Sequence, residues 1–282
     1  MIRKLLKYDF KSMLRFWYVA AITTAVLTVI GCGCMHVVNN TRSYPEAIII
    51  LSWIFLAIVI LSYFAFSIVA IIIVFARFYK NLFTDEGYLT FTLPIKKITV
   101  LNSKIISGFS ILFATSLVTV VEVCLLLNCV TVSFGIAPEA MSTITVLETL
   151  WGSIKYMIEA DHTALGYANF LTVLLTYIAT TLFQLLFIYV CITIGSIVAK
   201  KAKVALAIAF YYLASSSFGT VMGILYTMVV PYLSERLGEV SRNSQVAVST
   251  LIIWVVFITV LLGCAFCYAF LHKALDRKLN LA

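Results

Sequence analysis

Glu122 is an ionisable side chain inside a long apolar stretch of the sequence, residues 105–127. A carboxylate surrounded by hydrocarbon is costly, which makes such a residue a candidate contact for a transported ion or substrate. The alternative is a structural role, in which Glu122 shares a hydrogen bond with Gln184, Asn128 or a hydroxyl group across a helix interface. Glu122 and Gln184 are therefore candidates for lining a path through the protein or for holding its helices together.

Cysteines and histidines do not form a recognisable metal or redox site in the sequence. The pairs Cys32-x-Cys34 and Cys264-x-x-Cys267 fall in apolar stretches, where cysteine acts as a small polarisable hydrophobe. Residues two apart diverge on a helix, so the first pair is poorly placed to hold one metal ion. The three histidines lie beside three different apolar stretches: His36, His162 and His272. We expect no metal or cofactor to be bound by this chain.

Nucleotide-binding and hydrolytic motifs are missing from the sequence. There is no G-x-x-x-x-G-K-[ST] loop to cradle phosphates, no H-E-x-x-H pair for zinc and no G-x-S-x-G nucleophile elbow. The chain is therefore not expected to be an enzyme.

The elements that must position these residues are membrane helices. Of 282 residues, 63% are hydrophobic and 11% are charged, and the mean hydropathy is +1.08. Soluble domains are nearer half apolar and a quarter charged, which excludes soluble enzymes, nucleic-acid-binding domains and disordered regulators. Backbone amides cannot be left unpaired in lipid, so long apolar runs must be helices. Six runs are long enough to cross a membrane, at residues 17–38, 47–76, 105–127, 168–199, 204–230 and 248–271. The sequence predicts one all-α domain with six transmembrane helices.

Basic residues set the orientation of these spans. Sixteen of the 20 lysines and arginines fall before the first span, between the second and third, between the fourth and fifth, and after the sixth. Such residues accumulate on the cytoplasmic side of membrane proteins, so both termini are predicted to be cytoplasmic. The other four lie on the opposite side: Arg42, Lys155, Arg236 and Arg242. We expect a multi-pass protein of the cell membrane.

Residues 1–16 have the pattern of an amphipathic helix at the cytoplasmic surface of the membrane. Basic residues fall on one face and apolar residues on the other. The basic face holds Lys4, Lys7, Lys11 and Arg15, and the apolar face holds Ile2, Leu6, Phe10, Met13 and Trp17. The helix is expected to serve as an anchor parallel to the membrane or as a docking surface for a cytoplasmic partner.

The cytoplasmic connection over residues 77–104 is unusually aromatic for a segment in contact with water. The second span has 30 residues, roughly 45 Å as a helix, and should tilt or project into the cytoplasm. Gly87 suits the end of a helix, and Pro94 suits the first turn of the next one. Aromatic side chains in such a segment are expected to be covered, either by the helix bundle and lipid headgroups or by a partner protein. The aromatic residues are Phe78, Tyr79, Phe83, Tyr88 and Phe91.

The external segment and a glycine motif in the fifth span also allow structural predictions. The external segment 135–167 is expected to be a cap or a substrate gate, with an interfacial helix over residues 141–156. Gly219-x-x-x-Gly223 in the fifth span lets helix backbones approach closely, either within the chain or at an interface between subunits.

The cytoplasmic connection over residues 77–104 resembles that of bacterial type-2 ABC exporter permeases. These proteins are the membrane subunits of ATP-driven transporters. The likeness is specific over residues 86–94 (EGYLTFTLP) and covers the rest of the chain in outline, through the basic N-terminal helix, the six spans and the basic tail at 277–281. It implies a type V-like permease fold in a bacterial cell membrane, paired with a second permease copy as a homodimer or heterodimer.

The resemblance also implies a separate ATPase subunit, which would bind the ATP and magnesium. The residues that would contact this ATPase are Asp85, Glu86, Gly87, Tyr88, Phe91, Pro94, Lys4, Lys7 and Lys11. Substrates in the family include antimicrobial peptides, drugs, lipids and polymers, and the low charge of the spans favours an amphipathic or apolar cargo.

Two other functions are kept as alternatives. An ion-coupled secondary transporter or channel would use Glu122 as its coupling carboxylate, although none of the four prolines breaks a span as such carriers often require. A membrane scaffold or immunity protein would transport nothing. An ATPase encoded beside this chain would favour the ABC permease, and transport without ATP would favour the ion-coupled protein.

Overall fold

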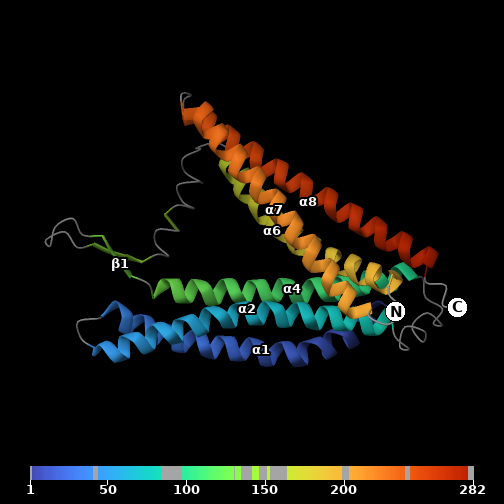
Figure 1. Cartoon of the computed structure of the whole chain (residues 1–282), viewed down its shortest axis with the longest axis horizontal. Coiled ribbons are helices and arrows are strands. Elements are labelled where there is room, and N and C mark those ends of the chain that lie inside the picture. The colour runs from blue at the N-terminus through green and yellow to red at the C-terminus, as the bar shows by residue number, and fades with distance from the viewer. Residues whose placement is uncertain are drawn as a thin grey trace. The chain divides into compact units, whose positions relative to one another are not determined.

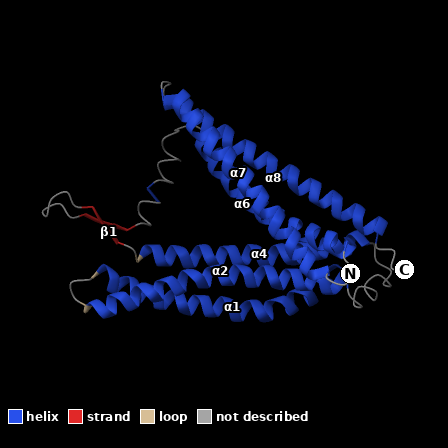
Figure 2. Cartoon of the chain, viewed as in Figure 1, coloured by secondary structure: helices blue, strands red, loops and turns tan. Residues whose placement is uncertain are grey.

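The computed structural model describes residues 2–40, 44–83, 97–129, 131–134, 142–145, 151–152, 164–198, 203–238 and 242–278. These residues form six long helices and one two-stranded antiparallel pairing (Figures 1 and 2). The helices are α1 (Ile2–Asn39), α2 (Glu46–Phe83), α4 (Lys97–Asn128), α6 (Ala164–Val198), α7 (Lys203–Gly238) and α8 (Arg242–Lys278). The strands are β1 (Thr131–Phe134) and β2 (Ser142–Thr145).

Five of the helices are long and apolar enough to cross a membrane. Their apolar parts are Leu5–Asn39, Glu46–Phe83, Ile98–Asn128, Phe170–Val198 and Ile253–Ala274. The sixth helix, α7, has a shorter apolar part, Val204–Ser217, among the residues searched. The chain is therefore a multi-pass α-helical membrane protein, as predicted, and the sixth span stays a prediction.

The chain divides into two compact units. Unit 1 contains residues 1–77 and 106–166, and unit 2 contains residues 78–105 and 167–282. The division falls inside two helices, so the last turns of α2 and the first turns of α4 group with the C-terminal helices.

Unit 1 is a bundle in which α1, α2 and α4 lie side by side (Figure 1). Its apolar core is formed by Leu56, Val59 and Leu126. Gly31 lets α1 come close to both neighbours, because a Cβ added there would lie 3.0 Å from Leu126 and 3.2 Å from Val59. Small residues have this role in membrane helices, where close packing replaces the hydrophobic effect.

The two ends of the unit 1 bundle are tied by polar contacts that fix the helix directions. At one end Asn39, the last residue of α1, donates a hydrogen bond to the carbonyl of Cys129 just after α4, at 2.7 Å. At the other end Arg77 of α2 pairs with Asp9 of α1 at 3.2 Å. The C-termini of α1 and α4 therefore share one end, and α2 runs opposite to them, which agrees with the predicted alternation of spans.

Unit 2 is built around α6, whose Leu185, Ile188 and Ile192 are almost fully buried. Gly195 allows α7 to approach α6 closely, because a Cβ added there would lie 2.8 Å from both the backbone nitrogen and the Cβ of Ala207 on α7. On the α8 side, the Cys264 thiol donates to the carbonyl of Ala179 at 3.6 Å. Helices α7 and α8 thus both pack on α6.

The predicted separate interfacial helix over residues 1–16 is wrong as an element. Helix α1 continues from Ile2 to Asn39 without a break, because no proline or turn residue interrupts the sequence at the expected junction. The predicted faces are confirmed where side chains are described, since Lys7, Lys11 and Arg15 are exposed while Met13 and Trp17 are buried. The buried face packs against protein, in contrast to the acyl chains expected from the sequence.

The predicted connection 77–104 is helical at both ends. Helix α2 has 38 residues, roughly 57 Å, which is longer than the hydrocarbon thickness of about 30 Å. It ends at Phe83, and α4 begins at Lys97. Residues 84–96 lie outside the described part of the chain.

The interfacial helix expected over residues 141–156 is wrong at its start. Strand β2 occupies Ser142–Thr145 and pairs with β1, with Ile144 opposite Val132. Three of its four residues are β-branched, which favours a strand over a helix.

Replacing Gly195 by alanine is expected to destabilise the protein by about 1–3 kcal/mol, because the new methyl group meets backbone that cannot move aside. Gly33 on α1 is the matched control, since a Cβ there meets nothing within 4 Å, and its replacement by alanine should leave stability equal or slightly higher. Thermal unfolding of the two variants in detergent measures the difference. Equal loss in both would contradict the close approach of α6 and α7.

Candidate functional site

A line of hydrogen-bonded polar side chains crosses the interior of unit 1. Its members, which we call the polar seam, are Trp17, Thr24 and Thr28 of α1, Tyr63 of α2, and Thr115 and Glu122 of α4. Positions seven apart are about two helical turns apart and so lie on one face. This spacing relates Trp17 to Thr24 on α1 and Thr115 to Glu122 on α4.

Three hydrogen bonds between side chains hold the seam together. Trp17 donates from Nε1 to the Thr115 hydroxyl at 2.8 Å, and Thr24 donates to Oε1 of Glu122 at 2.9 Å. The hydroxyls of Thr28 and Tyr63 lie 2.9 Å apart. Each bond joins two different helices, so the seam fixes the rotation of α1 against both α2 and α4.

Glu122 has one carboxyl oxygen without a hydrogen-bond partner among the described residues. Its side chain is 4% exposed, and Oε2 has no hydrogen-bond partner among the described residues. Leaving a buried polar atom without a partner costs about 1–3 kcal/mol, and more if the group is charged. The predicted hydroxyl partner across a helix interface is therefore confirmed, while half of the carboxyl group is left free for another contact.

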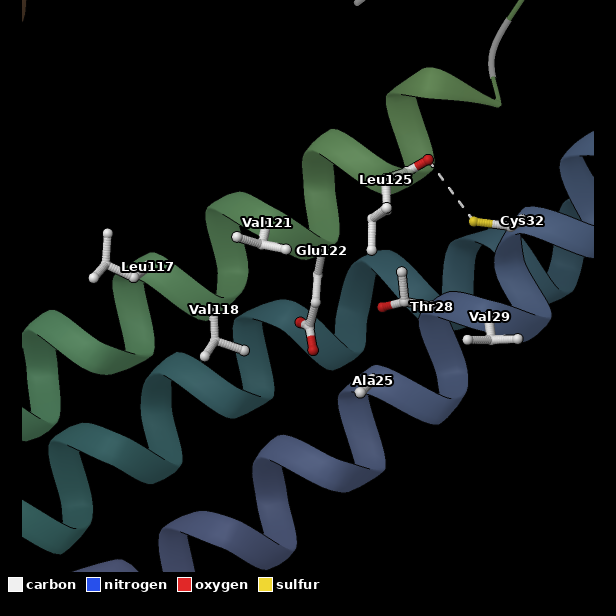
Figure 3. A pocket seen from close by; sticks show the side chains of 9 residues that line it. All are labelled: Ala25, Thr28, Val29, Cys32, Leu117, Val118, Val121, Glu122 and Leu125. Carbon is white, nitrogen blue, oxygen red and sulfur yellow. Dashed lines mark hydrogen bonds between the residues drawn. The ribbon is translucent and has the colours of Figure 1, made fainter.

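A groove of about 540 Å³ runs beside Glu122 between α1 and α4. Figure 3 shows Glu122 and Thr28 entering from the two helices between apolar walls. The lining residues are Ala25, Thr28, Val29, Cys32, Leu117, Val118, Val121, Glu122 and Leu125. The groove is in the size range of small-molecule sites and, like them, combines apolar walls with few polar groups.

Gln184 and Gly219 line a second groove, of about 580 Å³, in unit 2. The other lining residues are Phe183, Phe187, Tyr211, Ala214, Ser215 and Ser217. Within unit 2, Gln184 is thus a neighbour of aromatic and hydroxyl groups.

The expected close packing of the Gly219–Gly223 motif within the chain is wrong for the part of the chain that the structure describes. A Cβ added at Gly219 or Gly223 meets nothing within 4 Å, and both residues are exposed. The other possibility, an interface with a second subunit, is not contradicted.

Most residues predicted to contact an ATPase lie outside the described part of the chain, namely Asp85, Glu86, Gly87, Tyr88, Phe91 and Pro94. The side chain of Lys4 is also outside it. Lys7 and Lys11 are exposed on α1, on the face opposite Met13 and Trp17, as the sequence predicted.

The segments on either side of residues 84–96 are fastened to the other helices of unit 2. Phe78 is buried and its ring stacks on Tyr189 of α6, with centroids 3.7 Å apart and planes 8° from parallel. Tyr189 also donates a hydrogen bond to the carbonyl of Lys104 at 3.0 Å. Tyr268 of α8 donates to Oδ1 of Asn102 at 3.1 Å. Phe78 is therefore buried against another helix of the same chain. Of the two alternatives that the sequence left open for this residue, packing within the bundle is the one observed.

Asp9 of α1 and Arg77 of α2 form an ion pair that was not predicted from the sequence. Asp9 is 2% exposed, and its carboxylate accepts a hydrogen bond from Nε of Arg77. The signal was present, because Asp9 falls four residues before Met13 on the apolar face of α1, where a charged side chain needs a partner.

The described residues contain no cluster of histidine, cysteine or acidic side chains that could hold a metal ion. Compared with known protein families, with curated proteins and with solved structures, the chain has no match.

Replacing Thr24 by valine is expected to lower the free energy of unfolding by about 1–2 kcal/mol, because Oε1 of Glu122 then loses its donor as well. Thr23→Val is the matched control, since the exposed Thr23 hydroxyl bonds only to the carbonyl of Val19 in its own helix. Denaturation in detergent, followed by Trp fluorescence, measures both. A loss in Thr23→Val as large as in Thr24→Val would show that the seam contributes nothing.

Proposed function

We propose that this chain is the permease subunit of an ATP-driven ABC transporter, an exporter of amphipathic or apolar substrates worked by a separate ATPase. The proposal includes six spans, with α7 as the fifth, and both termini in the cytoplasm of a bacterial cell. It is supported by the multi-pass helical fold, by the bias of basic residues and by the lack of a nucleotide-binding motif in a chain that resembles such permeases.

The observation that carries the proposal is the anchoring of both sides of residues 84–96 on α6 and α8. A segment that receives force from an ATPase must be rigidly joined to the helices it moves. The stack of Phe78 on Tyr189 and the bond from Tyr189 to the Lys104 carbonyl join α2, α4 and α6 at one residue. The Tyr268–Asn102 bond adds α8 to the same group.

The proposed mechanism is a switch between two packings of the helices. Closure of two ATPase subunits displaces the 84–96 segment, and Phe78, Asn102 and Lys104 pass the displacement to α6 and α8. Packed helices have discrete arrangements, so a small displacement is converted into opening of the path on the other side.

A second copy of the chain would complete the path. Exposed Gly219 and Gly223, with the run Ser215–Ser217 before them, give α7 a smooth surface on which another helix can pack closely. This surface is our proposed contact between the two permease copies, and Gln184 lies beside it in the same groove as Gly219.

An ion-coupled transporter is the second candidate function. The unpartnered oxygen of Glu122 favours it, because coupling carboxylates in membranes bind and release a cation or a proton. Transport by the purified chain in vesicles with an ion gradient and no ATP would support this candidate over the ABC permease.

A tagged copy of the chain is expected to copurify with a soluble ATPase. The double variant Glu86→Lys and Tyr88→Ala should lose most of that ATPase, because it reverses a charge and removes an aromatic contact in the proposed docking segment. Arg236→Glu, on the predicted outer side, is the control that should retain it. Quantitative immunoblotting of the eluted ATPase measures both variants, and full retention by the double variant would remove the docking site from the proposal.

Weakening the contact between Tyr189 and the Lys104 carbonyl is expected to lower ATPase activity without affecting ATPase binding. Tyr189→Phe keeps the ring stack but loses the bond to the Lys104 carbonyl, which is worth about 1 kcal/mol. We expect the complex to retain its ATPase while its ATP turnover falls several-fold. The control is Tyr212→Phe, because Tyr212 is 71% exposed on α7. Unchanged turnover in Tyr189→Phe would argue against force transmission through this residue.

A further inference from the structure

We propose that the groove between α1 and α4 binds lipophilic cations, with Glu122 as the residue that selects the charge. The inference rests on the proposed transport function, since it names the class of substrate: an apolar body carrying one positive charge. All residues that line the groove belong to unit 1.

The walls of the groove select an apolar ligand body. They are formed by Val29 on α1 and by Leu117, Val121 and Leu125 on α4, all substantially exposed within the described structure. The volume of about 540 Å³ accommodates a drug-sized molecule.

The floor of the groove selects the charge. None of the nine lining residues is basic, so no cation in the lining balances Glu122. Oε1 is already held by Thr24, whereas Oε2 is buried without a partner among the described residues. A cationic ligand supplies the missing partner, and an anionic ligand of the same size meets a carboxylate in apolar surroundings.

The Glu122 side chain must turn for this contact to form. Oε2 is covered in the present arrangement, and Glu has three rotatable bonds through which it can present the oxygen to the groove. Thr28, which lines the same groove, is held in place because its hydroxyl donates to the carbonyl of Thr24 at 2.8 Å and lies 2.9 Å from the hydroxyl of Tyr63. The seam thus holds Glu122 at the groove while leaving one oxygen for the ligand.

The test uses two rigid ions of equal size and opposite charge. The purified full chain, in nanodiscs of phosphatidylcholine without ATP or partner, is titrated with radiolabelled tetraphenylphosphonium and with tetraphenylborate. We expect saturable binding of the phosphonium alone. Glu122→Gln should weaken it roughly ten- to hundredfold, as loss of a charged partner does, and Glu122→Asp should retain part of it.

A second pair of variants tests the walls and keeps the proposal open to refutation if Glu122→Gln fails to fold. Val121→Trp fills the groove and should abolish binding, whereas Val255→Trp on α8 should not, because Val255 has nearly the same exposure, 57% against 58%. Equal binding of both ions, unchanged affinity in Glu122→Gln, or equal affinity in the two tryptophan variants would overturn the proposal. Because no ATPase is present, cation binding can persist if the ABC function fails, and the reverse outcome is equally distinguishable.

Discussion

The need to satisfy polar groups inside the protein governs this structure, because hydrocarbon offers them no other partner. Backbone amides meet the requirement through long helices, and side chains meet it through bonds between helices. In unit 1 the Trp17–Thr115, Thr24–Glu122 and Thr28–Tyr63 bonds each join two helices. Apolar packing alone would leave α1 free to rotate, since its lipid-facing and protein-facing residues are chemically alike. The seam removes that freedom, and the groove beside Glu122 exists because the seam fixes where α1 and α4 meet.

The same requirement is met differently in unit 2. There the residues that continue α2 and α4 are joined to α6 and α8 by aromatic stacking and by tyrosine hydroxyls that bond to a backbone carbonyl and an amide. Tyrosine suits such positions because one end of the side chain is apolar and the other forms a hydrogen bond. Unit 1 therefore contains Glu122, the candidate binding residue. Unit 2 contains the contacts that we propose to transmit force from the ATPase.

The sequence predicted the long helices well, because membrane thickness and hydropathy alone decide them. Five of the six predicted spans fall within a helix, and the fourth, 168–199, runs one residue past the end of α6 at Val198. The sequence also identified Glu122 from its apolar neighbours, but it offered three kinds of partner for that residue. Thr24 could not be chosen without knowing the rotation of α1 against α4. Phe78 was placed in a water-facing connection because the end of α2 could not be read from composition. Asp9 was overlooked because a single acidic residue hardly changes the amphipathic pattern around it.

The uninterrupted course of α1 has a mechanical consequence. A helix of 38 residues without proline is stiff over its whole length of roughly 57 Å. Its first turns carry the exposed Lys7 and Lys11, and its middle carries Thr24 and Thr28. The first turns of α1 and the hydrogen bond from Thr24 to Glu122 therefore belong to one stiff element, with no joint between them.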